Sequence, residues 1–242
     1  MFNALRAAFM VTTAAVTVTA QTYHAPRTAG GQPDLQGIWQ ALSTASYNLL
    51  PHSAELGLPA GVGVVVGGEI PYTPEAAAQQ KENFKNRATA DPNNHCFLPG
   101  VPRANYMPFP FQIFQTPKDV AILYEYVHGY RLIPLDGSKH PEDIDFWMGD
   151  SRGHWDGDTL VVDVADNNGD TWFDDSGNFH SGALHVVERY TRTGPDTISY
   201  EATIEDPKTF TKPWKIALTL SRYQEKGFQL MEYDCYAYPS SK

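Results

Sequence analysis

One stretch near the middle of the chain constrains its fold more than any other. Residues 146–165 read FWMGDSRGHWDGDTLVVDVA. Asp156-Gly157 is typical of a tight β-hairpin turn, because glycine readily adopts the positive φ that such a turn requires. Along the strand that follows, Leu160, Val162 and Val164 share one face. The stretch therefore predicts a β-hairpin that gathers polar and aromatic side chains at its end, where a sheet protein can hold a ligand.

Strand patterns fill most of the chain beyond this hairpin. Apolar and polar residues alternate, and turn signals separate the segments, over residues 111–115, 120–128, 130–135, 152–155, 159–164, 184–193, 197–205, 216–223 and 229–237. A further strand at 35–40 brings the total to about ten, and the short connections imply antiparallel neighbours. The sequence predicts a mainly β fold, with a single antiparallel sheet that closes into a barrel or curves strongly.

One segment is predicted to be a surface helix. Thr73 can cap its first turn, and Pro74 suits the first helical position. The pattern continues through Arg87 and stops before Asp91-Pro92. Most of its residues are polar, so we expect packing through only a few side chains: Ala77, Phe84 and Ala88.

The N-terminus predicts export. Residues 1–20 carry one cation, Arg6, followed by a run of apolar and small residues that ends in Val18-Thr19-Ala20. This layout is typical of a signal peptide, and the alternative is a frayed N-terminal strand. The run is too short and too polar to span a membrane. We expect a periplasmic or secreted protein in which residues 21–242 form a single β-rich domain.

The cysteine count predicts a disulfide, and the net charge disfavours two classes of binding partner. The chain has two cysteines, Cys96 and Cys235. One even pair in an exported protein predicts one disulfide, and two buried free thiols are the alternative. The net charge of −10 argues against nucleic acid and against anionic membrane surfaces. The sequence contains no phosphate loop, dinucleotide fingerprint or haem motif, so we expect no cofactor.

Several longer motifs carry a resemblance. They are PDLQGIW at 33–39, CFLPGVPR at 96–103, WMGDSRG at 147–153, LHVVERY at 184–190 and EDP at 205–207. With these motifs the chain resembles a large group of uncharacterised exported bacterial proteins. The Gly-x-Trp of residues 37–39 is also similar to the first strand of lipocalin-like barrels, in which the tryptophan plugs one end. That resemblance implies that Trp39 is buried, and neither group transfers catalytic residues.

Titratable groups interrupt the apolar alternation in two places, the 150–158 hairpin and the strand around 185–190. We expect these groups to converge on one pocket, with a histidine carrying the proton because only that side chain ordinarily titrates near neutral pH. The candidate catalytic residues are His154, His180, His185, Glu188 and Asp150. The candidate substrate-binding residues are Arg152, Arg103, Trp147, Trp155 and Tyr124. The alternative is a set of structural ion pairs and ordinary core aromatics.

Metal binding is not expected from these patterns. His180 and His185 are five residues apart, which matches no tight metal-ligand template. Residues 166–170 space their oxygen ligands like a calcium loop, but the distal bidentate glutamate is missing. We interpret that segment as a polar turn.

Two classes of function remain. The first is a cofactor-free acid–base enzyme, a lyase, isomerase or hydrolase, that acts on a small organic molecule in a barrel pocket. The alternative is a periplasmic or secreted binding protein for a hydrophobic small molecule. The two are distinguished by strand register: if the imidazoles and Glu188 lie on opposite sides of the sheet with no cleft between them, the binding function is favoured.

Overall fold

A single antiparallel sheet dominates the computed structural model, which describes residues 23–55 and 58–235. Within these residues the sheet has nine strands in the order β4-β3-β2-β1-β9-β8-β7-β6-β5. The strands are β1 (Gly37–Ala41), β2 (Phe111–Gln115), β3 (Asp119–Tyr124), β4 (Tyr130–Pro134), β5 (Asp150–Asp156), β6 (Thr159–Ala165), β7 (His185–Gly194), β8 (Thr197–Glu205) and β9 (Trp214–Arg222). The mainly β prediction is confirmed.

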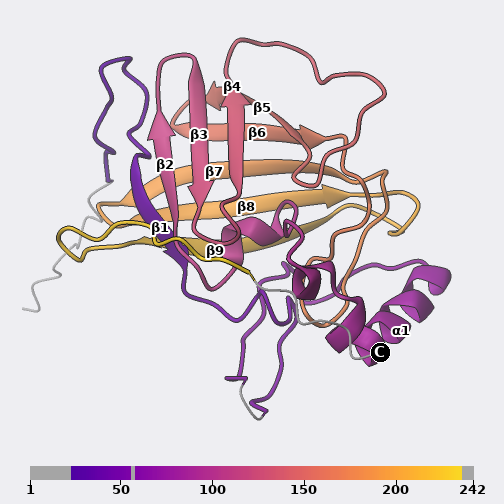
Figure 1. Ribbon diagram of the computed structural model, residues 1–242. Helices are drawn as coiled ribbons and strands as arrows, with labels where there is room; N and C mark the ends of the chain where they lie inside the picture. The colour runs from indigo at the N-terminus through magenta and orange to yellow at the C-terminus, as the bar shows by residue number, and fades with distance from the viewer. Residues whose placement is uncertain (1–22, 56–57, 236–242) are drawn as a thin grey trace, which may run out of the picture.

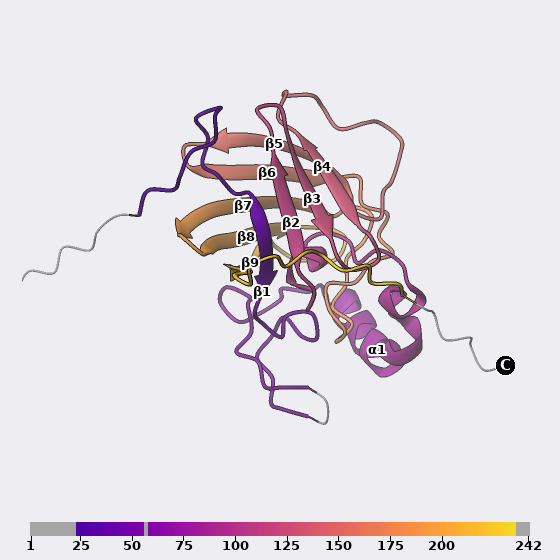
Figure 2. The ribbon, with the colours of Figure 1, turned by 60° about the vertical axis from the view of Figure 1, so that its left-hand side comes forward.

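The sheet curves until its two edges meet. In Figure 1, β2, β3 and β4 cross steeply in front of the longer strands β5 to β9, and Figure 2 shows β1 connecting the two groups. The edge strands β4 and β5 touch through side chains: Arg131 Nη2 donates to Ser151 Oγ over 2.9 Å. Gly153 of β5 lies so close to β4 that a Cβ there would be 2.8 Å from Ile133 Cγ2. The result is a nearly closed barrel.

Side chains of the inner face fill this barrel. Alternate residues of β8, from Ile198 to Ile204, are fully buried, as the period-two pattern requires. Trp39 of β1 is also fully buried, and its Nε1 donates to the carbonyl oxygen of Leu35 over 2.9 Å. The predicted burial of Trp39 is confirmed.

The hairpin predicted at Asp156-Gly157 is present. Asp156 of β5 pairs with Thr159 of β6, and Gly157 has the expected positive φ of 58°. The two cysteines form the predicted disulfide, with the Cα atoms of Cys96 and Cys235 5.5 Å apart. The disulfide is consistent with an exported protein. The predicted signal peptide lies outside the described residues.

Two predicted strands differ from the structure. The strand expected at 120–128 ends at Tyr124, because Val127 and His128 turn the chain with positive φ angles. The strand expected at 229–237 is absent over its described part, 229–235. There Tyr233 instead stacks against Tyr126, with ring centroids 5.5 Å apart. This segment is therefore held by aromatic contacts and the disulfide in place of a full ladder of strand hydrogen bonds.

The helix α1 (Pro74–Ala90) forms where the sequence predicts it. Thr73 caps it, and its side chain accepts a hydrogen bond from the Ala76 backbone nitrogen over 3.2 Å. Its packing differs from the prediction, since Ala76 is the buried residue and Phe84 remains 43% exposed. Two short 3₁₀ turns follow, η1 (Pro92–His95) and η2 (Arg103–Tyr106). No helix in the described part of the chain is long and apolar enough to cross a membrane.

Candidate functional site

Strand geometry separates the predicted catalytic residues, so the expected single pocket is wrong. On β7, Glu188 points into the barrel and is fully buried, while His185 points outward. On β5, the outward residues are Asp150, Arg152 and His154. Side chains alternate with a period of two, so residues 185 and 188 must lie on opposite faces. The sheet itself stands between the two groups.

His180 lies in a third place, on neither of these faces of the sheet. Its Nε2 is 2.7 Å from Thr171 Oγ1, and its Nδ1 is 2.9 Å from the Ser181 carbonyl oxygen. Burial lowers the pKa of His180 below its ordinary value. The ring packs on Phe173, with centroids 5.1 Å apart. His180 is thus a neutral core histidine with both nitrogens hydrogen-bonded.

The buried face carries a closed polar network around Glu188. Its Oε2 accepts from Arg131 Nη2 over 2.5 Å, and its Oε1 accepts from Asn105 Nδ2 over 2.7 Å. The hydroxyls of Tyr190 and Tyr200 also donate to Oε1. The predicted binding residue Tyr124 joins this network by donating to Asn105. Such a fully satisfied network stabilises a core.

There is little room for a ligand beside this network. The cavity lined by Leu98, Met107, Tyr124 and Met148 holds about 10 Å³, which is no more than one water molecule needs. The expectation of a ligand inside the barrel therefore has no support in the packing, because large aromatic side chains occupy that volume.

Two tryptophans predicted to bind substrate, Trp147 and Trp155, pack against other side chains of the protein. Trp147 stacks on Phe97 with centroids 4.5 Å apart. Trp155 is half-buried and packs against the hydrophobic core. Neither residue lines the two large surface pockets beside α1.

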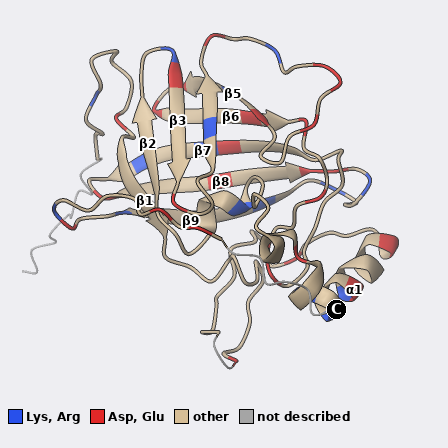
Figure 3. Ribbon diagram, in the orientation of Figure 1, with Lys and Arg blue, Asp and Glu red and all other residues tan. Residues whose placement is uncertain are grey.

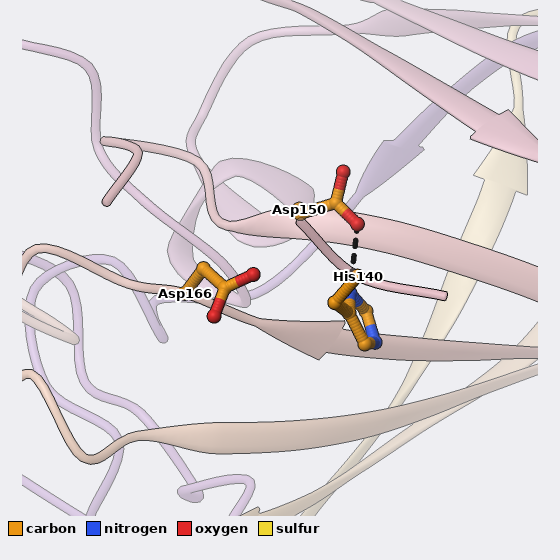
Figure 4. Close-up of side chains that lie close together, drawn as sticks. All are labelled: His140, Asp150 and Asp166. Carbon is orange, nitrogen blue, oxygen red and sulfur yellow. Dashed lines mark hydrogen bonds and ion pairs between the residues drawn. The ribbon is translucent and has the colours of Figure 1, made fainter. Parts of the chain in front are cut away.

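The outward residues of β5, β6 and β7 include a connected set of charged and ionisable side chains; Figure 3 marks the Lys, Arg, Asp and Glu positions on the ribbon. Arg152 donates from Nε to Asp150 over 2.6 Å, and Asp150 Oδ1 is 2.7 Å from His140 Nδ1. His140 Nε2 is 2.7 Å from Asp163, whose other oxygen is 2.8 Å from His185 Nε2. His140 comes from the loop before β5 (Figure 4), where no periodic pattern in the sequence pointed to it. Three predicted residues thus meet here around a histidine that sequence reasoning missed.

A large concavity lies elsewhere, between α1 and the segment 47–72. One lobe encloses about 590 Å³ and a second about 340 Å³. The two lobes share Asn48, Phe84 and Ser176 as lining residues, so they adjoin each other in the cleft beside α1. In Figure 1, α1 is drawn below the sheet, and its residues line both lobes.

Close packing between α1 and the loop 174–178 forms one wall of the cleft. Gly177 has a positive φ of 80°, and a Cβ there would be 2.8 Å from the Phe84 backbone nitrogen. Gln80 Nε2 donates to the Ser176 carbonyl oxygen over 2.8 Å, and Asn83 Nδ2 donates to that of Gly177 over 3.2 Å. The close approach of Gly177 to the α1 backbone and two side-chain amide hydrogen bonds therefore hold α1 against the loop 174–178.

Asp174 anchors the same loop from beneath. Its Oδ2 accepts from the Leu49 backbone nitrogen over 2.8 Å, and its Oδ1 accepts from the backbone nitrogens of Ser176 and Asn178. Burial raises the pKa of Asp174 to about 7, against these hydrogen bonds, which lower it. This carboxyl joins the segment containing Leu49 to the loop 174–178, so it holds the two sides of the cleft together.

The second lobe ends at a pair of carboxyl groups that share one arginine. Arg103 is fully buried and donates from Nη1 and Nη2 to Asp91 over 3.0 and 2.9 Å. The same Nη2 donates to Asp175, whose side chain is 46% exposed toward the lobe. Burial raises the pKa of the Asp175 carboxyl, and Arg103 opposes that rise. Arg103 was predicted to touch substrate, but its burial makes it a positioning residue for Asp175.

Comparisons with known proteins leave the site to be judged from its own geometry. No family model, no curated protein and no solved structure matches this chain. The resemblance to exported bacterial proteins stays a prediction.

Proposed function

We propose that the protein is an exported binding protein for a small amphipathic organic molecule, which occupies the cleft beside α1. The observation that carries this proposal is the cleft of two adjoining lobes, of about 590 Å³ and 340 Å³, which both have Phe84 in their lining. Ligand pockets commonly have volumes of roughly 300–1,000 Å³. The disulfide supports the exported location.

The lining of the first lobe suggests the chemistry of the ligand. Leu50, Ile70 and Phe84 offer apolar contacts, and Asn48 and Gln80 offer amide groups. Arg87 lies over the Phe84 ring, 4.1 Å from its centroid, and helps to hold the ring in place. A ligand with an apolar ring or chain and a few hydroxyl or amide groups would match this lining. Lys81 could pair with an anionic substituent, whereas Lys85 is already paired with Glu82 over 3.0 Å and Glu69 lines the same lobe.

The outward histidines support binding over the catalysis expected from sequence. Glu188 and His185 are separated by the sheet, and neither residue lines the cleft beside α1. Proton transfer needs groups within hydrogen-bond reach of one substrate. That arrangement is absent for this pair.

A fluorescent dye tests the binding proposal. We would titrate the mature protein with 1-anilinonaphthalene-8-sulfonate, which has aromatic rings and one negative charge. One saturable site is expected, and Phe84→Ala should weaken it at least about tenfold because the shared wall of both lobes is lost. Tyr130→Ala is the matched control, since Tyr130 is a 73% exposed aromatic on β4. No saturable binding, or equal losses in the two variants, would refute the proposal.

One observation favours a second candidate function, a cofactor-free acid–base enzyme in the same cleft. Asp175 faces the second lobe with a raised pKa, and Arg103 links it to Asp91. Paired carboxyl groups in different environments are a common arrangement for acid and base roles. With nitrophenyl esters and glycosides as probes, Asp175→Asn should abolish turnover and retain dye binding. Asp158→Asn, on the distant β5–β6 turn, serves as the control, and an equal rate in both variants would exclude this role.

A further inference from the structure

The outward face of the sheet holds a second group of residues that the proposed binding function does not use. His140, Asp150 and Asp166 each offer one ligand atom, and these three atoms lie within 4.8 Å of one another. Figure 4 shows the three side chains converging from the loop before β5, the start of β5 and the end of β6. From this geometry we infer a site for a divalent first-row transition metal ion such as Zn²⁺.

The Asp166 carboxylate gives the first independent sign of a missing partner. Its Oδ2 atom is buried, and no hydrogen-bond donor in the described part of the chain reaches it. A buried carboxylate oxygen without a donor is costly, and a bound cation would compensate it. Asp166 also has a left-handed φ of 57°, held by a hydrogen bond of 2.8 Å from the Phe146 nitrogen to its carbonyl oxygen. The backbone is thus fixed in a conformation that few residue types adopt.

His140 gives the second sign, because it faces carboxylates from both ring nitrogens. Its Nδ1 is 2.7 Å from Asp150 Oδ1, and its Nε2 is 2.7 Å from Asp163 Oδ1. A metal ion bound at His140 Nδ1 and Asp150 would leave His140 Nε2 to donate its proton to Asp163. The histidine–carboxylate pair behind a ligand is a common feature of protein metal sites.

Both His140 and Asp150 have supporting partners. Asp163, which holds His140, is itself oriented by His185 over 2.8 Å, and Asp150 is oriented by Arg152 through Nε and Nη2. Close packing holds the backbone around the site, since a Cβ on Gly149 would be 2.7 Å from Val164 Cγ1. The predicted site residues Asp150, Arg152 and His185 thereby gain a role around His140.

The donor set determines the kind of metal. One imidazole nitrogen with two carboxylate oxygens suits Zn²⁺ and its first-row neighbours, whereas Ca²⁺ and Mg²⁺ prefer oxygen ligands alone. Ligand atoms bound to one such ion at roughly 2.0–2.2 Å lie about 3–4 Å apart, so the side chains need only small rotations to close. Three protein ligands would leave a coordination position open to water.

Calorimetry with metal ions tests the inference on the full mature chain. The protein is first treated with EDTA and dialysed, and then titrated with Zn²⁺ and separately with Ca²⁺. One Zn²⁺ per chain is expected, with Ca²⁺ binding at least about tenfold weaker. Asp166→Asn should reduce Zn²⁺ affinity at least about tenfold, and it keeps both the size of the residue and its tolerance of positive φ.

Matched variants separate this site from weak surface binding. His154→Asn and Asp156→Asn remove an exposed histidine and an exposed aspartate of the same strand and should leave the affinity unchanged. A Co²⁺-loaded sample should lose its visible absorption in His140→Gln, and circular dichroism would verify that each variant is folded. Failure of the wild type to bind Zn²⁺, or an Asp166→Asn affinity equal to that of the wild type, would overturn the inference. Dye binding in the cleft beside α1 is unaffected by either outcome, so the two proposals fail separately.

Discussion

The buried pair of Glu188 and Arg131 provides the sharpest test of how this barrel is held together. We predict that Glu188→Gln destabilises the protein by about 3–5 kcal/mol. The substitution keeps the shape of the side chain and removes its charge. Both partners are almost completely buried, at 0% and 3% exposure, so solvent cannot take over the role of the carboxylate.

The magnitude follows from what surrounds Arg131. In the described residues Glu188 is the only acidic partner within ion-pair distance of its guanidinium, at 2.5 Å. Its other neighbours, Ser151 Oγ and Tyr124 Oη, are neutral. The amide introduced by the substitution would also place an NH₂ group against either Arg131 or Asn105, which are both donors there. An uncompensated buried charge typically costs several kcal/mol, a large share of the roughly 5–15 kcal/mol that stabilises a domain.

Urea unfolding at pH 7 with the disulfide intact measures this cost. Far-UV circular dichroism and the fluorescence of the five tryptophans should give coincident transitions. The slope with urea should match that of the wild type, so that the midpoint reports stability. Glu201→Gln is the control, because Glu201 is partly exposed and its Oε2 lies 4.0 Å from Lys215 Nζ. That exposed pair should contribute less than about 1 kcal/mol.

A double variant provides the decisive comparison. In Arg131→Met/Glu188→Gln no buried charge remains unpaired, so the loss should be smaller than the sum of the two single losses. A loss below about 1 kcal/mol for Glu188→Gln would refute the reasoning, as would strict additivity in the double variant. Either result would mean that the pair is not coupled.

Three further predictions follow from the fold. Trp39→Ala should cost about 3–5 kcal/mol in urea melts, because the ring is fully buried, and a loss below about 1 kcal/mol would show that it is peripheral. Replacing Cys96 and Cys235 with alanine should cost up to about 5 kcal/mol, since the disulfide joins residues 139 positions apart; thiol titration of denatured, unreduced wild type should find no free thiol. His180→Gln should flatten the loss of stability as pH falls below about 6.5, because the unfolded chain gains a proton there that the buried ring, with its lowered pKa, does not; an unchanged pH dependence would contradict this.

The sequence alone determined the local structure well. The turn at Asp156-Gly157, the cap at Thr73 and most of the strands formed where the patterns predict them. These features depend on hydrogen bonding and burial within a few residues. The apolar periodicity and the turn-forming and capping residues of the sequence therefore predict them directly. The even cysteine count together with the predicted export was enough to predict the disulfide between Cys96 and Cys235, which the structure contains.

Strand alternation by itself separates two of the candidate catalytic residues. The separation of His185 and Glu188 by three positions already places them on opposite faces of β7. What the pattern left open was which face lies inside. Closure of the barrel decided this, by placing the carboxylate of Glu188 beside Arg131, 57 residues away in the chain.

The remaining features arose only in the tertiary structure. His140 comes from an irregular loop without periodicity, and it meets Asp150 and Asp163 only because β5 and β6 lie side by side. The cleft beside α1 is likewise formed by three segments that are distant in sequence, including the loop of Asp174 and Asp175. Local patterns record which residues are buried and how the backbone is paired. Sheet curvature and loop positions determine which residues pair with a buried or half-buried charged side chain. Both depend on packing between segments that are distant in the sequence.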